Sequence, residues 1–150
     1  MSATKRIAGQ VFVLVPDTGD VRAMVYAAKK ACRVAYQLNF EPMAPLLYFL
    51  TFLSSGEYNM DVKRLAFKWL RRSDRIWLEF PEGINSDQMI DSLTYDILDE
   101  NQRLSECRSV YMLQATGDEK LGFLPMPLPR QDIRELLLMN LTSGLISNCI

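Results

Sequence analysis

Residues 10–20 read Gln-Val-Phe-Val-Leu-Val-Pro-Asp-Thr-Gly-Asp, and this stretch decides the fold class. Its first six residues form a continuous apolar run rich in β-branched side chains, which is typical of a strand covered on both faces in a parallel sheet. Pro16 and the polar residues after it break the strand, and Asp20 is a good N-cap for a following helix. From Val21 to Leu38, small and apolar residues recur at helical spacing. Strand, turn and helix in this order form the first half of a βαβ unit.

The same alternation continues along the chain. The sequence predicts further strands around residues 40–44, 75–80 and 109–113, helices at 62–72 and 87–99, and a loop or short helix at 46–53 that covers the sheet. Asp87 is a good N-cap for the helix that follows it. Alternating strands and helices predict an α/β fold: a doubly wound, mainly parallel sheet of four to five strands flanked by helices, as in flavodoxin-like and Rossmann-like domains.

The two ends of the chain differ from this central part. Residues 1–9 are polar and basic, and we expect a flexible terminus there, whereas residues 10–116 make the α/β domain. Residues 117–150 make a proline-rich connector followed by an apolar helix from Asp132 to about Leu141. Proline lacks the N–H that a helix or a central strand needs, so we expect the connector to be neither. The C-terminal helix packs on the domain or on a second copy of the chain, and the second arrangement would give a homo-oligomer.

Composition limits the chemistry. The chain has no histidine, which excludes Ser-His-Asp and Cys-His mechanisms and histidine-ligated metals. Its three cysteines are widely spaced without a CxxC pair, so we expect free thiols, no zinc site and no cofactor. The net charge of -1 provides no field that would attract nucleic acid or an anionic membrane. With no signal peptide and no apolar stretch near the ~20 residues that cross a bilayer, we expect a cytoplasmic protein.

Two predicted helices carry stripes of basic residues. The stripes are Arg22, Lys29, Lys30 and Arg33 in the first helix and Arg64, Lys68, Arg71 and Arg72 in the next. Cations in such a row can hold phosphate groups. Helices on the outside of a sheet usually present charged faces to water, however, and these stripes contain no interleaved aromatic residues for base stacking. We therefore interpret them as solvated faces and do not expect nucleic-acid binding.

Polar side chains gather in the loops that follow the predicted strands, where open α/β sheets bind their ligands. These side chains are Asp17, Thr18, Asp20, Tyr48, Glu79, Glu82, Asn85, Ser86, Asp87 and Asp91. They offer carboxylates, hydroxyls and an amide, but the single Gly19 does not make a glycine-rich phosphate loop. Structural roles are open for the same residues: Thr18 and Gly19 as turn residues, Tyr48 as a core aromatic, and Asp91 as a partner of the helix dipole.

Four stretches, in this order, resemble the nucleoside 2-deoxyribosyltransferase-like superfamily, in particular its small bacterial and phage branch. They are residues 16–20 after the buried strand, 43–48 (Met-Ala-Pro-Leu-Leu-Tyr), 70–78 (Leu-Arg-Arg-Ser-Asp-Arg-Ile-Trp-Leu) and 84–89 (Ile-Asn-Ser-Asp-Gln-Met). The resemblance implies a cleft that binds a nucleoside or nucleotide and a helix-borne carboxylate that attacks the anomeric carbon. A carboxylate suits this step because the transition state resembles an oxocarbenium ion, which a nearby anion stabilises.

The resemblance also implies site residues. Asp91 and Tyr48 would be catalytic, and Asp17, Thr18, Gly19, Asn85, Ser86 and Met89 would bind the substrate. The chain departs from the pattern of the branch where Ser92 replaces its glutamate, Leu46 its histidine and Gln88 the glycine before Met89. These departures favour a nucleoside-binding or nucleotide-binding domain with reduced or lost N-glycosidic activity. An active N-glycosidase or deoxyribosyltransferase that uses Asp91 is the alternative, and a protein-interaction module is a further one.

Overall fold

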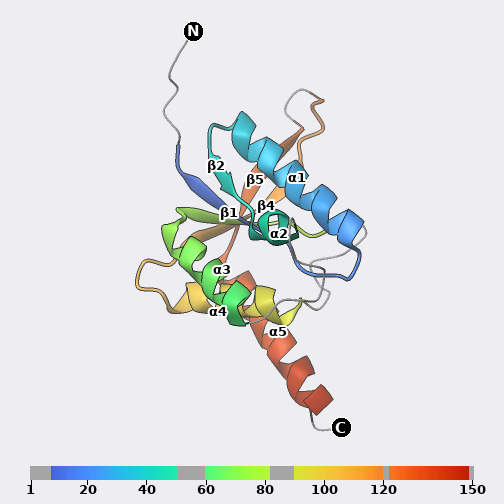
Figure 1. Cartoon of the computed structure of the whole chain (residues 1–150), viewed down its shortest axis with the longest axis vertical. Coiled ribbons are helices and arrows are strands. Elements are labelled where there is room, and N and C mark those ends of the chain that lie inside the picture. Colours follow the sequence, from blue (N-terminus) through green and yellow to red (C-terminus); the bar gives the residue numbers. More distant parts are fainter. Residues whose placement is uncertain (1–7, 51–59, 82–89, 120–121, 149–150) are drawn as a thin grey trace.

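The computed structural model describes residues 8–50, 60–81, 90–119 and 122–148 (Figure 1). In this part of the chain, ten elements follow one another as β1 (Gln10–Leu14), α1 (Val21–Gln37), β2 (Glu41–Met43), α2 (Pro45–Leu50), α3 (Met60–Arg72), β3 (Arg75–Leu78), α4 (Ser92–Arg103), β4 (Ser109–Ala115), β5 (Phe123–Leu128) and α5 (Arg130–Asn148). The protein is therefore an α/β protein, as the sequence predicts. None of the helices described is long and apolar enough to cross a membrane.

The strands form one five-stranded sheet in the order β2-β1-β3-β4-β5. β1 pairs in parallel with β2 and β3, and β3 pairs in parallel with β4, but β5 pairs with β4 in the antiparallel sense. The sheet is mixed, so the prediction of a mainly parallel sheet is wrong. The physical reason is the short connection between β4 and β5, which leaves no room for a crossover helix and makes a hairpin instead.

Strand β5 lies within the segment that the sequence predicts to be a connector. Its backbone register explains how prolines fit there: Thr116 N donates to Gly122 O over 2.9 Å, and Leu124 and Met126 lie opposite Gln114 and Met112. Backbone groups alternate in direction along a strand, so the backbone nitrogens of Pro125 and Pro127 face away from β4. No hydrogen bond to β4 is lost at these two positions. An edge strand tolerates this arrangement, whereas a central strand does not.

Helices cover both faces of the sheet. Figure 1 shows α1 on one side of the sheet and α3, α4 and α5 on the other. Alternate residues of β1 supply the two cores: Val11 and Val13 pack with α1, while Phe12 and Leu14 pack with α3, α4 and α5. The burial of residues 11–14 on both faces of the sheet confirms the prediction of a strand covered on both sides.

The first half of α5 belongs to the core of the same chain. Ile133, Leu136 and Leu137 are buried in the cluster that contains Phe12 and Leu70. These three residues thus pack on their own domain. Leu138, by contrast, is 64% exposed.

Candidate functional site

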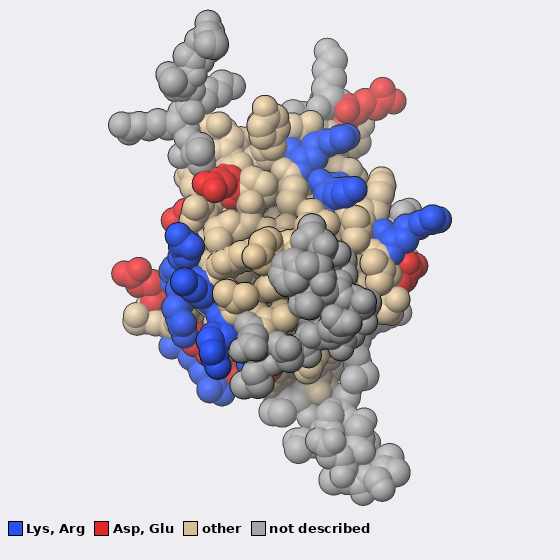
Figure 2. Space-filling view, viewed as in Figure 1, with Lys and Arg blue, Asp and Glu red and all other residues tan. Residues whose placement is uncertain are grey.

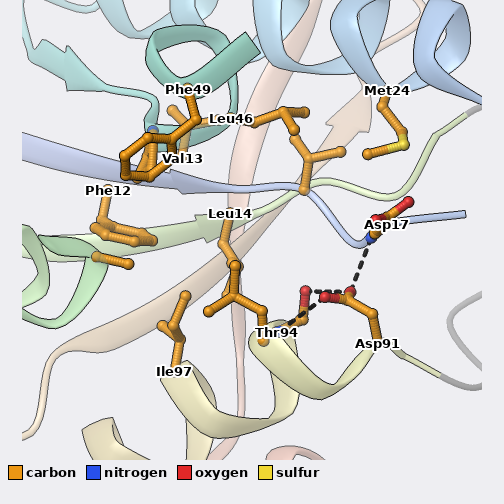
Figure 3. A pocket seen from close by; sticks show the side chains of 14 residues that line it. Phe12, Val13, Leu14, Asp17, Met24, Leu46, Phe49, Asp91, Thr94 and Ile97 are labelled. Carbon is orange, nitrogen blue, oxygen red and sulfur yellow. Dashed lines mark hydrogen bonds between the residues drawn. The ribbon is translucent and has the colours of Figure 1, made fainter. Parts of the chain in front are cut away.

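The strand order reverses between β1 and β3, because the chain passes from β1 to β2 on one side and to β3 on the other. In open α/β sheets, ligands bind at such a switch point, beyond the carboxyl ends of the strands. The structure brings together two of the residues expected there. The backbone N–H of Asp17, which follows β1, donates to Oδ1 of Asp91 over 2.8 Å (Figure 3).

Asp91 is the N-cap of α4. Its Oδ2 accepts a hydrogen bond from Thr94 N at 3.1 Å, and its Oδ1 accepts from Thr94 Oγ1 at 2.5 Å in addition to Asp17 N. Its backbone is extended, with φ -73° and ψ 164°, so it precedes the helix. The helix predicted to begin at Asp87 therefore begins at Ser92, because Asp91 provides the cap that stops the helix from extending backwards.

The loop after β1 is built by its own side chains. Asp17 Oδ1 accepts from Gly19 N at 2.9 Å, and Thr18 Oγ1 accepts from Asp20 N at 3.4 Å. Gly19 has φ +85°, a conformation that side chains with a Cβ rarely adopt. Asp20 accepts from Ala23 N at 3.2 Å, which confirms it as the N-cap of α1. Thr18 and Gly19 are exposed and hold a turn, in the structural roles that the sequence leaves open for them.

Between these loops the structure has a small apolar cavity, shown in Figure 3. Its volume is about 30 Å³, and Val15 and Leu46, only 7% and 8% exposed, form part of its wall. Asp17, Asp91 and Thr94 supply its polar side. A cavity of this size holds a water molecule or two, whereas pockets for small-molecule ligands measure roughly 300–1,000 Å³. The cavity as it stands does not admit a nucleoside.

Tyr48 lies elsewhere. Its ring, 49% exposed on α2, packs edge-on against Trp69 with centroids 5.1 Å apart. Together with Trp69 and Arg72 it borders a separate surface pocket that starts at the first residues of β1 and β2. Tyr48 and Asp91 therefore face different pockets. The remaining expected site residues, Asn85, Ser86 and Met89, lie outside the described residues.

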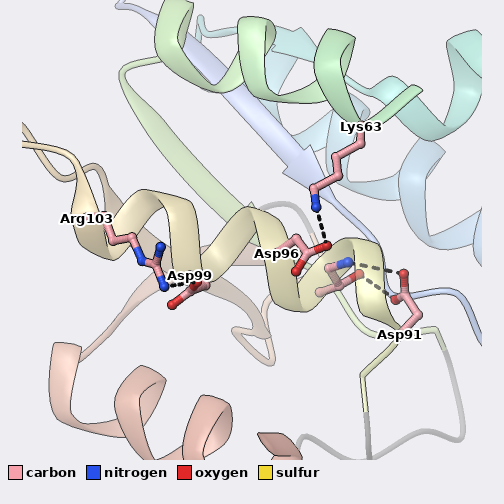
Figure 4. A network of polar contacts seen from close by, with 6 residues as sticks. Lys63, Asp91, Asp96, Asp99 and Arg103 are labelled. Atoms are coloured by element: carbon pink, nitrogen blue, oxygen red, sulfur yellow. Dashed lines mark hydrogen bonds and ion pairs between the residues drawn. The ribbon is translucent and has the colours of Figure 1, made fainter. Parts of the chain in front are cut away.

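No other carboxylate of α4 borders the cavity. Asp96 pairs with Lys63 of α3 at 2.9 Å, and Asp99 pairs with Arg103 one helical turn later at 3.1 Å (Figure 4). Both pairs lie at the partly exposed surface of α4, where such pairs contribute little to stability. Among the carboxylates of this helix and its cap, Asp91 is thus the one that borders the cavity.

Glu79 ends up on the α1 side of the sheet. It follows β3, is 7% exposed, and its carboxylate lies 2.9 Å from the Lys30 ammonium of α1. Burial raises the pKa of the Glu79 carboxyl, and the hydrogen bond and charge of Lys30 partly oppose that rise. The Glu79 carboxylate thus pairs with α1, and Glu79 does not border the cavity between Asp17 and Asp91.

Sequence reasoning missed two residues that fix the site. Thr94, which is 1% exposed, donates its hydroxyl to Asp91, and the Asp-x-x-Thr spacing of a helix cap is the signal that could have found it. Asn140 of α5 accepts from Ile90 N at 2.9 Å and donates to Leu136 O at 2.8 Å. No local pattern connects Asn140 to a backbone group fifty residues earlier. Residues 90 and 91 are therefore held by α4, α5 and the loop after β1.

Comparisons of the chain with protein-family models, with curated proteins and with solved structures found no match. The resemblance to the nucleoside 2-deoxyribosyltransferase-like superfamily consequently rests on the four sequence stretches and their order.

Proposed function

We propose that this chain is a divergent nucleoside 2-deoxyribosyltransferase-like domain that binds a nucleoside or nucleotide at the carboxyl edge of its sheet without cleaving the N-glycosidic bond. The observation that carries the proposal is the state of the Asp91 carboxylate, which accepts three hydrogen bonds from Thr94 and Asp17. A carboxylate nucleophile needs an oxygen that can reach the anomeric carbon. Both Asp91 oxygens are instead held by the chain itself.

The location and the remaining polar groups support ligand binding. The site lies at the switch point of the sheet, where the resemblance also implies a nucleoside cleft. Asp17 is half-buried there, and its Oδ2 accepts no hydrogen bond from any residue that the structure describes. A carboxylate oxygen in this position suits the hydroxyl groups of a ribose. Because the cavity below is small and apolar, the ligand would lie across its mouth, with Asn85, Ser86 and Met89 as further contacts.

Thermal unfolding with a panel of nucleosides and nucleotides tests the proposal. A ligand that binds only the folded state at one hundred times its Kd stabilises that state by about 2.7 kcal/mol, so the midpoint should rise by several degrees. Chromatography of the same samples should find no free base. Asp17→Asn keeps the oxygen that accepts from Gly19 and should reduce the thermal shift, whereas Asp132→Asn, the same change in the first turn of α5, should not.

Two outcomes would decide against the proposal. If no nucleoside or nucleotide raises the melting temperature at saturating concentration, the binding proposal fails. If free base appears and disappears again in Asp91→Asn, the alternative of an active N-glycosidase or deoxyribosyltransferase is correct, since asparagine preserves the cap but cannot act as the nucleophile.

A second candidate, self-association through α5, is favoured by two exposed apolar side chains. Leu138 is 64% and Met139 42% exposed, whereas Leu136 and Leu137 are already buried in the core. We propose that a dimer contact on this helix uses the exposed pair. Leu138→Gln with Met139→Gln should then lower the mass found by light scattering, and an unchanged mass would refute the contact.

A further inference from the structure

Another concave surface lies on the other side of the sheet from α5, along α1. It is a groove of about 480 Å³ between α1 and the β4–β5 hairpin, which is within the size range of small-molecule sites. One face of α1 forms its wall, from Tyr26 to Gln37, and Phe123 of β5 lines the opposite side. Figure 2 shows basic side chains gathered over α1 beside this hairpin, apart from a second basic band over α3.

Lys30 is fixed at this groove by a buried partner. Its ammonium lies 2.9 Å from the Glu79 carboxylate, whose side chain is 9% exposed, and 4.6 Å from the centre of the Phe123 ring. A buried carboxylate is costly unless a cation compensates it. The pair therefore holds the Lys30 ammonium between the sheet and the groove rather than letting the flexible side chain extend into water.

Two further cations border the groove without such a partner. Lys29 and Arg33 are exposed, and neither forms an ion pair with a residue in the part of the chain that the structure describes. The acidic groups nearby are Glu119 at the hairpin and Glu79 below Lys30. Among the described residues that line the groove, three are cations and one, Glu119, is a carboxylate. An Arg fork beside ammonium groups is the arrangement that recognises a phosphate.

Aromatic surface adjoins the cations. Tyr26 is 62% exposed and lies seven residues before Arg33 on the same helix, a separation of about 10 Å along the axis. An exposed aromatic ring offers a face on which a planar ring can stack. One small molecule can therefore place a ring against Tyr26 and an anionic group near Arg33.

We propose that this groove is a ligand site separate from the carboxyl edge of the sheet, and that it binds a phosphomonoester of an aromatic or heterocyclic small molecule. The phosphate lies among Lys29, Lys30 and Arg33, and the ring lies on Tyr26. Glu79 acts as a positioning residue for Lys30. The site does not depend on the proposed nucleoside cleft, because none of the residues that line the groove also lines the cavity beside Asp17 and Asp91.

Titration with phenyl phosphate, followed by the backbone amide resonances of the intact chain, tests the proposal. The resonances of α1 and of Gly122 should shift, inorganic phosphate should bind more weakly, and phenol should not bind. Lys29→Gln with Arg33→Gln should weaken the binding of phenyl phosphate about tenfold or more, since charge-assisted hydrogen bonds are lost. Lys68→Gln with Arg72→Gln, the same change in charge on exposed positions of α3, should leave it within twofold.

The control separates a built site from general attraction of anions. If both double variants bind phenyl phosphate equally weakly, or if millimolar phenyl phosphate shifts no α1 resonance, the proposal is wrong. If inorganic phosphate binds as tightly as phenyl phosphate, the contact with Tyr26 is refuted. Nucleosides without phosphate should still raise the melting temperature of the Lys29→Gln, Arg33→Gln protein, so failure of this site and failure of the nucleoside cleft are distinguished.

Discussion

Replacing Asp91 by alanine separates the structural role of this carboxylate from a catalytic one. The substitution removes the cap of α4, which is worth about 1 kcal/mol, and the hydrogen bond from Asp17 N to a charged acceptor, worth about 1.5 kcal/mol or more. It also leaves the hydroxyl of Thr94, at 1% exposure, without its acceptor. We expect Asp91→Ala to lower the free energy of unfolding by roughly 3 kcal/mol.

Asp20 supplies the matched control, because among the described residues its side chain accepts one hydrogen bond, the one that caps α1. Asp20→Ala should cost only about 1 kcal/mol. For a chain of this length, 1 kcal/mol corresponds to roughly 2–4 °C in the melting temperature. Thermal unfolding followed by circular dichroism should therefore show a fall of about 6–12 °C for Asp91→Ala and about 2–4 °C for Asp20→Ala.

Asparagine provides the second control, since it is as good an N-cap as aspartate and keeps one acceptor oxygen. Its NH2 group takes the place of the other oxygen, so Asp91→Asn can keep either the cap to Thr94 N or the hydrogen bond from Asp17 N. Its loss of stability should therefore lie between those of Asp20→Ala and Asp91→Ala. The reasoning is refuted if the melting temperatures of Asp91→Ala and Asp20→Ala differ by less than about 2 °C. The hydrogen bond to the loop after β1 would then contribute nothing measurable.

Three further predictions follow from buried groups and from the sheet edge. Burial raises the pKa of the Glu79 carboxyl in the folded protein, and Lys30 only partly opposes this rise. The protonated carboxyl therefore favours the folded state below the pKa of the unfolded chain, and this stability is lost as pH rises through the higher pKa of the folded state. Urea unfolding should show the parent chain losing stability relative to Glu79→Gln from about pH 4 upward, and parallel curves would contradict this. Burial also raises the pKa of the Cys32 thiol, so Cys32 should react with iodoacetamide at pH 8 more slowly than free cysteine; an equal rate argues against it. Pro125→Thr with Pro127→Thr gives the outer edge of β5 two N–H groups and should cause concentration-dependent association in light scattering, which a monomeric variant would disprove.

The fold was predictable where the determining signals are local. The apolar run of β1, the turn at Gly19 and the cap at Asp20 lie within eleven consecutive residues, and each signal agrees with the others. Strand β5 was not predictable in the same way. Whether Pro125 can sit in a strand depends on which side of that strand is paired, and only the partner β4 decides this.

Part of the candidate site was predictable from the sequence, and part depended on contacts that the sequence does not show. That Asp17 and Asp91 meet follows from parallel strands whose carboxyl ends share one edge. That the carboxylate is already occupied depends on Thr94 and on the direction of a backbone N–H, which spacing alone does not give. Tyr48 borders a different pocket from Asp91, and its ring on the six-residue helix α2 packs against Trp69, a contact that no local pattern gives.

The cap at position 91 also clarifies what the replacement at position 92 means. A helix needs its cap one residue before the first helical residue, and Asp91 meets this need through Thr94 N. In the pattern of the branch that the chain resembles, the glutamate would stand at the next position, the first of the helix, where its longer side chain is not needed for capping. Capping and attack on the anomeric carbon would then belong to two different carboxylates. Here Ser92 occupies the second position, and Asp91 cannot act as nucleophile without releasing Thr94 and Asp17. Under the proposed function, the carboxylate at position 91 stabilises the fold, and none stands at the position of the glutamate in that branch.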